Sequence, residues 1–146
     1  MRYLSCDVQA ADLAWAAGFY EGEGCLLFSL SRDPRGRRNP LQRYGHLLLE
    51  IVQADPEPLN HLLNIFPKSR LTGPEPHHQG HKDIWRFRIS NFEGTQAALA
   101  MMWPWLSRRR KDQAKTALLA FYRHNKARPR LRHGPLQEGE IALPQS

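Results

Sequence analysis

The pattern of apolar and polar positions predicts a helix followed by a long β-hairpin at the start of the chain. Residues 12–22 are small and apolar at helical spacing, with Asp12 as the expected N-cap and glycines near the end. Residues 25–32 alternate between large apolar side chains on one face and a face that includes two serines. This alternation indicates a strand with one buried face. Residues 46–53 form the second strand, after a basic turn rich in Pro and Gly.

The same order returns in the second half of the chain. Residues 56–66 carry apolar side chains in a helical stripe, preceded by an Asp-Pro start signal and followed by a proline. Residues 69–90 predict a second hairpin, whose return strand alternates between apolar side chains and arginines. Two helices, over residues 92–106 and 107–126, complete the pattern.

The resulting order is αββαββαα, which predicts an α+β fold in a chain long enough for one domain. We expect this domain to span residues 1–126, with a curved antiparallel sheet and helices on its other face. Residues 127–146 are rich in Pro and Arg and are expected to form an extended tail.

Composition adds a strong positive charge to this picture. The formal net charge is +7, which favours a polyanionic partner, nucleic acid before a membrane surface. Sixteen of the 21 cationic residues are Arg, which suits phosphate and guanine contacts, although a GC-rich genome produces the same bias. No apolar run is long enough to span a membrane, and two cysteines are too few for a disulfide framework. These features predict a cytoplasmic protein.

The first predicted helix carries small residues four positions apart, at Ala14, Gly18 and Gly22, with Ala17 beside them. Small residues at this spacing allow another backbone to approach closely. The partner is either the same helix of a second copy, across a two-fold axis, or another helix of the same domain.

Two glutamates, Glu21 and Glu23, lie at the end of this helix, where they oppose the helix dipole. Local violations of this kind are expected at functional sites. A carboxylate beside free carbonyl oxygens is a suitable site for a hard cation such as Mg²⁺.

Residues 16–24, AAGFYEGEG, resemble the signature of the LAGLIDADG homing endonucleases, with Glu in place of Asp. The expected element order resembles that family over about residues 8–126. Members with a single motif act as homodimers, so the resemblance implies a homodimer whose two curved sheets form a DNA-binding saddle.

The resemblance also implies roles for individual residues. Glu23 matches the catalytic carboxylate that binds the metal, Mg²⁺ or another divalent cation such as Mn²⁺, and Gly22 can lend its carbonyl. Glu21 matches a supporting acidic position, and Gln53 matches a polar residue that orders solvent. A catalytic basic residue is expected in the run SRRRKDQAK. Counting back from the QA dipeptide favours Arg110, whereas residue type favours Lys111.

The implied function is site-specific cleavage of both strands of double-stranded DNA, at a long pseudo-palindromic site, by metal-dependent phosphodiester hydrolysis. The polar face of the sheet and its turns supply the expected DNA contacts. These candidates are Ser29, Ser31, Asp33, Arg35, Gln42, Glu50, Arg70, Thr72, Arg86 and Arg88. Each of them is also consistent with an ordinary solvated position of a half-exposed sheet.

Two other functions stay open at this point. One is a non-cleaving or bifunctional protein on the same scaffold, either a maturase that helps an intron RNA to splice or a DNA-binding protein. The other is a metal nuclease based on His77, His78 and His81, which lack the usual spacing of zinc ligands. The arginine bias favours a bacterial or phage gene over an organellar one.

Overall fold

A computed structural model describes residues 9–32 and 43–127 of the chain. The predicted αββαββαα order is confirmed. The elements are α1 (Ala10–Glu23), β1 (Gly24–Arg32), β2 (Arg43–Gln53), α2 (Pro56–Ile65), β3 (Arg70–Glu75), β4 (Ile84–Ile89), α3 (Phe92–Met102), a 3₁₀ turn (Trp103–Trp105) and α4 (Arg108–Ala127). Asp33, Arg35, Gln42 and the predicted tail beyond residue 127 lie outside the described residues, as does the side chain of Ser31.

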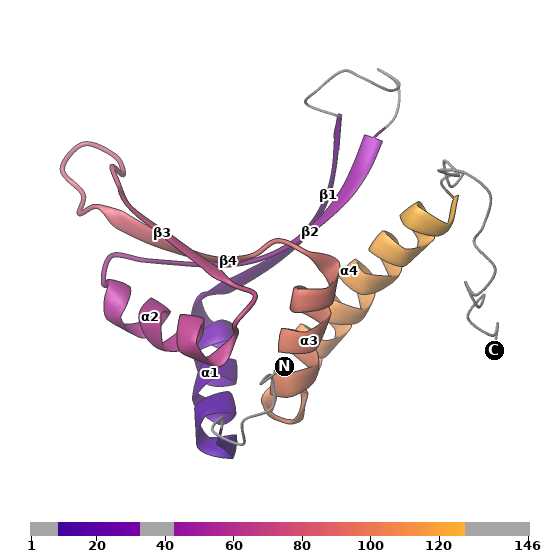
Figure 1. The fold of residues 1–146 in the computed structure, drawn as a ribbon, viewed down its shortest axis with the longest axis horizontal. Coiled ribbons are helices and arrows are strands. Elements are labelled where there is room, and N and C mark those ends of the chain that lie inside the picture. Colours follow the sequence, from indigo (N-terminus) through magenta and orange to yellow (C-terminus); the bar gives the residue numbers. More distant parts are fainter. Residues whose placement is uncertain (1–8, 33–42, 128–146) are drawn as a thin grey trace, which may run out of the picture.

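The four strands form one antiparallel sheet in the order β1-β2-β4-β3. The two hairpins bend away from each other, so the sheet is a curved trough with one open face (Figure 1). The helices lie together on the opposite side of the sheet, as expected for the α+β fold. No helix within the described ranges has the length and apolar character that a membrane span requires.

The core lies between the sheet and the helices. Alternate strand residues such as Leu47, Leu49 and Ile51 are fully buried, and Phe87 and Ile89 continue the apolar layer on β4. Helices contribute further buried residues: Ala16, Ala17, Tyr20, Leu59, Leu62, Ala98, Leu99, Met102 and Ala114. Strand residues of the other parity point into the open face, as the period of two dictates. The core therefore fixes which side chains are available on the open face.

Two details of the predicted helices were wrong. The N-cap of α1 is Gln9, three positions before Asp12; the Asp12 carboxylate accepts the Gln9 N–H at 3.3 Å from within the first turn. The predicted helix over residues 92–106 ends at Met102, and a 3₁₀ turn that contains Pro104 follows it. Proline lacks an N–H and clashes with the preceding turn, so it stops the α-helical ladder at this point.

Candidate active site and nucleic-acid interface

Glu23 is the last residue of α1, and its side chain is exposed where the helix passes into β1. Gly24 follows with an extended backbone, and its N–H donates to the Tyr20 carbonyl. A Cβ at Gly24 would clash with the Tyr20 ring and would lie 2.7 Å from the Tyr20 carbonyl oxygen. The small residue at this position therefore lets the chain pass from α1 directly into the edge strand β1, with Glu23 exposed immediately before that strand.

Glu21 points away from Glu23 and joins α1 to α4. Its carboxylate accepts the Ser107 backbone N–H and, at 3.0 Å, the Ser107 hydroxyl. Ser107 in turn accepts the Arg110 N–H at 3.2 Å, as an N-cap of α4 does. A carboxylate is electrostatically favourable at a helix N-terminus. Glu21 thus makes a structural contact, which accords with the supporting role that the resemblance implies.

Arg110 is buried and binds the C-terminal end of α1. Its Nη2 atom donates to the carbonyls of Tyr20, Glu21 and Gly24 at 3.2, 3.0 and 2.8 Å. The guanidinium also lies over the Tyr20 ring, 4.6 Å from its centroid. Burial raises the pKa of the Tyr20 phenol above its ordinary value, so the ring stays neutral beneath the cation. Arg110 therefore adds a charged donor to three main-chain carbonyls where α1 ends and β1 begins, including the Tyr20 carbonyl that also accepts the Gly24 N–H.

Lys111, the alternative basic candidate, contacts a different part of the molecule. Its Nζ atom lies 5.7 Å from the centroid of the Trp103 ring, and Lys115 approaches the same ring at 5.9 Å. Of the two candidates, the structure brings Arg110 to the helix end that carries Glu23. Its contacts there go to main-chain oxygens, which makes Arg110 a residue that positions this end.

Gln53 is the last residue of β2, two positions beyond Ile51, which pairs with Gly24 at the start of β1. It is half-buried and pairs with Trp85. The register therefore brings Gln53 to the end of the sheet at which α1 passes into β1.

A divalent cation would find two oxygen ligands here, the Glu23 carboxylate and the Gly22 carbonyl. Gly22 is exposed, and the carbonyls that Arg110 binds are those of its neighbours. No cluster of three or more His, Cys, Asp or Glu residues in the described ranges is arranged to hold a metal ion. Because Mg²⁺ takes six oxygen ligands, these two donors fit a site that water, phosphate or a second chain completes.

The stripe of small residues on α1 is only partly as predicted. Gly18 and Gly22 are exposed, and a Cβ on either would meet no atom within 4 Å. Ala14 is half-buried, but Ala17 is fully buried in the core of its own chain, so its assignment to an intermolecular face was wrong. Sequence reasoning missed Ala11 and Trp15, which are exposed on the same helix. The positions 11, 15, 18 and 22 follow helical spacing and define the outer stripe of α1.

The open face of the sheet carries most of the predicted DNA contacts that the structure describes. Cys25 pairs with Glu50, Glu50 with Arg88, and Arg88 with Arg70, so these side chains form one row across all four strands. Arg86 and Thr72 form the next row. Ser29 is exposed further along β1. Leu27, two residues before Ser29 on the same strand, is also exposed and pairs with Leu48.

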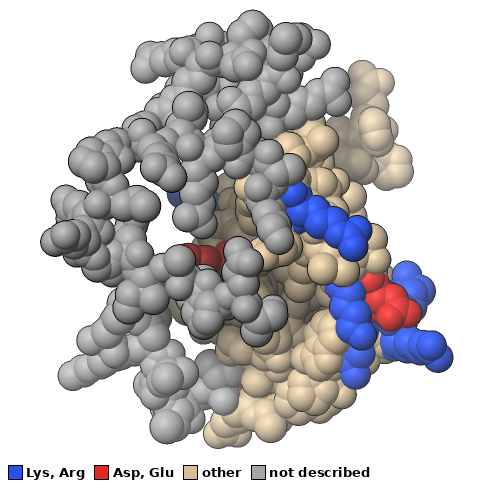
Figure 2. Space-filling model, turned by 90° about the vertical axis from the view of Figure 1, so that its right-hand side faces the viewer, with Lys and Arg blue, Asp and Glu red and all other residues tan. Residues whose placement is uncertain are grey.

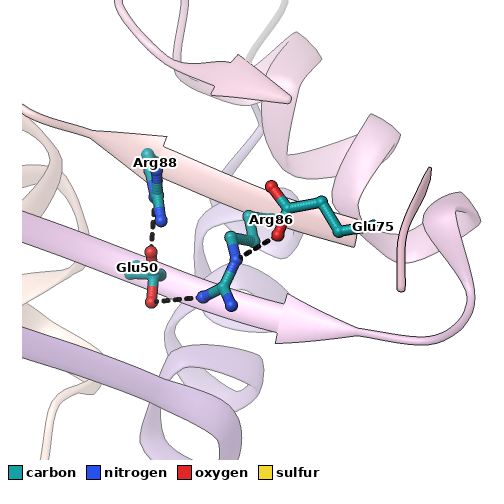
Figure 3. Close-up of polar contacts among 4 residues, drawn as sticks. All are labelled: Glu50, Glu75, Arg86 and Arg88. Atoms are coloured by element: carbon teal, nitrogen blue, oxygen red, sulfur yellow. Dashed lines mark hydrogen bonds and ion pairs between the residues drawn. The ribbon is translucent and has the colours of Figure 1, made fainter. Parts of the chain in front are cut away.

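Carboxylates hold two of these arginines (Figure 3). Arg86 donates from Nε to Glu75 at 2.7 Å and from Nη1 to Glu50 at 3.2 Å, and Arg88 donates from Nε to Glu50. The bond to Glu75 is the main cause that raises the pKa of Arg86 above its ordinary value. Glu75 was not predicted as a site residue, because the register of β3 against β4 shifts between Thr72 and Glu75 and no local pattern reveals that shift.

Two further groups of basic side chains lie outside the four strands. Arg108 and Arg109 are exposed at the start of α4, and Figure 2 shows Lys and Arg side chains exposed on the side of the molecule where this helix lies. His77, His78 and His81 are exposed near the β3–β4 turn, with ring centroids 4.6 to 6.4 Å apart.

Comparison with known proteins supports the fold. No protein-family model and no curated protein matches the sequence. Among solved structures, the chain is similar to the homing endonuclease I-CvuI in complex with an I-CreI target in the presence of Mg, with 20% identity over 79% of this chain and 68% of that chain and a TM-score of 0.62. It is similar to the group I intron-encoded homing endonuclease I-CeuI complexed with DNA, with 15% identity, coverage of 80% and 55%, and a TM-score of 0.58.

The LAGLIDADG meganuclease I-AabMI bound to uncleaved DNA gives 17% identity, a TM-score of 0.58, and coverage of 78% of this chain and 38% of that chain. At these identities the agreement is one of fold, and it extends over 78% to 80% of this chain. The chain therefore has the fold of the LAGLIDADG homing endonucleases.

Proposed function

We propose that the protein is a homodimeric, site-specific DNA endonuclease of the homing type that hydrolyses phosphodiesters with a divalent cation. One observation supports this function above the others: Glu23 is exposed at the end of α1, immediately before an edge strand of the sheet whose open face carries arginines. An acidic site beside a basic, curved surface suits a duplex whose scissile phosphate needs a cation.

The residues of the chain have separate tasks in this mechanism. Glu23 and the Gly22 carbonyl would hold Mg²⁺ or Mn²⁺, which when bound lowers the pKa of a coordinated water and stabilises charge on the phosphate. Arg110 keeps the end of α1 in place through its carbonyl contacts. Gln53 can orient a solvent molecule by hydrogen bonding. In the reaction, a water oxygen bonds to phosphorus as the bond to the leaving sugar oxygen breaks.

Two copies of the chain are needed to cut both strands. We propose that the outer stripe of α1 packs against its equivalent in a second chain, because Gly18 and Gly22 leave open space above the helix backbone. The two Glu23 side chains then lie near the two-fold axis, one for each strand. Mutual repulsion of carboxylates in such a pair is relieved by cations.

The direct test is cleavage of DNA by purified protein in Mg²⁺. A candidate site is obtained by rejoining the DNA that flanks the gene. Glu23→Gln preserves shape but removes the charge, and we expect at least a ~100-fold loss of cleavage with DNA binding retained. Glu93→Gln is the matched control, since this exposed carboxylate makes only a surface ion pair with Lys68.

Parent-like cleavage by Glu23→Gln would contradict the assignment of the active site. Binding to intron RNA by a parent protein that never cuts the rejoined allele would instead support the maturase function. Loss of cutting in a folded variant with all three hairpin histidines replaced would point to the histidine site.

A further inference from the structure

Four side chains on the open face form a closed set of ion pairs, which we name the paired-charge cluster: Glu50, Glu75, Arg86 and Arg88 (Figure 3). Glu50 lies on β2 between the two arginines of β4, and Glu75 reaches Arg86 from β3 on the other side. The cluster therefore spans three strands in the middle of the face that would meet DNA.

The charges in this cluster cancel. Two carboxylates and two guanidiniums sum to zero, so the cluster provides no net attraction for phosphate at long range. Arg70 differs, because it is exposed and makes no ion pair with any residue that the structure describes. A balanced cluster suits the neutral edges of bases better than the charged backbone, since base edges offer separate donors and acceptors.

The two arginines are not equally available. Arg86 uses Nε and Nη1 on carboxylates and is 27% exposed, whereas Arg88 uses Nε alone and is 41% exposed. Both terminal nitrogens of Arg88 are thus free for the two parallel hydrogen bonds that an arginine makes to guanine O6 and N7. Glu50, only 16% exposed, accepts the Arg88 Nε–H at the base of this fork.

From this arrangement we infer that Arg88 reads a guanine in the major groove of each half-site, and that Glu50 is the positioning residue that aims it. The inference rests on the proposed DNA-binding function. Glu50 restricts the rotamers of Arg88 before DNA arrives, which lowers the entropic cost of binding. Arg86, held from two sides, keeps Glu50 in place.

The register also locates the guanine. Glu50 pairs with both Cys25 and Arg88, so Arg88 lies two strands across the sheet from Cys25, which follows Glu23 by two residues. At ordinary strand spacings this separation is roughly 12 Å. We therefore expect the guanine about three to four base pairs from the scissile phosphate, at 3.4 Å per base pair.

The test is selection of bound duplexes, without Mg²⁺, from a library randomised around the rejoined site. Parent protein is expected to enrich guanine at one position in each half. Arg88→Lys keeps the charge but loses the fork, and we expect the guanine preference to fall about 10- to 100-fold at that position alone. Arg70→Gln should weaken binding to all sequences and reduce the salt slope by about 0.9, as loss of one phosphate contact does.

The Glu50→Gln variant distinguishes the orientation of the Arg88 side chain from simple electrostatic attraction of the protein to DNA. Removal of its charge should increase binding to unrelated DNA and make it more dependent on salt, while the guanine preference falls at least about 5-fold. Glu57→Gln, at an exposed position in the first turn of α2, changes the net charge equally and should leave the preference intact.

Two results would overturn the inference. The first is a parent protein with a defined site whose base preference survives both Arg88→Lys and Glu50→Gln; the proposed function would then still stand. The second is a folded parent protein that enriches no duplex in the selection. That result would reject the DNA-binding function as well.

Discussion

At the scale of single residues, the motif contains three glycines with different physical reasons to be there. Gly24 lacks space for a side chain, because a Cβ would clash with the buried Tyr20 ring. Gly18 and Gly22 have open space above them within the chain. The first is required by folding, and the other two are free to serve an intermolecular contact.

Gly24→Ala should therefore destabilise the isolated chain. We expect a decrease of about 1–3 kcal/mol in the free energy of unfolding, typical of overpacking, in urea denaturation. Gly22→Ala is the control: in an exposed helical position alanine is favoured over glycine by up to about 1 kcal/mol, so stability should stay equal or rise. A Gly24→Ala variant as stable as its parent would show that the Tyr20 ring yields.

Other single-residue features could not be read from the sequence. Ala17 was assigned to an intermolecular face as an apolar neighbour of the small-residue stripe, yet only the packing of α1 against the core shows that it is buried. Arg86 and Arg88 were predicted on the sheet face correctly, but their partners Glu50 and Glu75 come from strands 36 and 11 positions away. Such pairs depend on strand register, which local patterns do not contain.

At the scale of elements, the junction of α1 with α4 is the most consequential contact. Glu21 reaches the N-terminus of α4, and Arg110 returns from α4 to the carbonyls of α1. Each helix end thereby satisfies backbone groups of the other. The exposed position of Glu23 depends on this junction.

Replacement of Arg110 should loosen that junction. Arg110→Met keeps an apolar stem over Tyr20 but leaves three carbonyls without this partner, and we expect a loss of about 2–3 kcal/mol in the free energy of unfolding. Arg109→Met, exposed one position away on α4, should change stability by less than about 0.5 kcal/mol. Equal stabilities of the two variants in urea titrations would contradict the capping role.

The elements themselves were largely predictable, because each has a local signal. Asp55 followed by Pro56 marks the start of α2, and the Asp55 carboxylate does accept the Glu57 N–H at 3.0 Å. The alternation in residues 84–89 corresponds to β4. The N-cap of α1 failed because Asp12 and Gln9 can both satisfy free N–H groups, and residue preference alone favours the aspartate.

At the scale of the whole molecule, a single chain forms one trough and presents one Glu23. The outer stripe of α1, at Ala11, Trp15, Gly18 and Gly22, is the surface that would make the molecule two-fold symmetric. Trp15 stacks on Phe19, with ring centroids 5.4 Å apart, and places a large aromatic group next to the glycines. Small residues let helix backbones approach closely, and large aromatic side chains are frequent anchors of protein interfaces.

A bulky residue in this stripe should separate the chains without unfolding them. Gly18→Leu meets no atom of its own chain at the Cβ, so the variant is expected to fold with parent-like or higher stability. Sedimentation with duplex DNA should then show loss of the complex of two chains per site that we expect for the parent, and cleavage of both strands should fall at least about 100-fold. Asn60→Leu, which adds the same side chain to an exposed position of α2, should leave stoichiometry and cleavage intact. A Gly18→Leu variant that still binds as two chains and cuts at the parent rate would show that α1 does not form the interface; the second carboxylate would then have to approach the duplex from another surface.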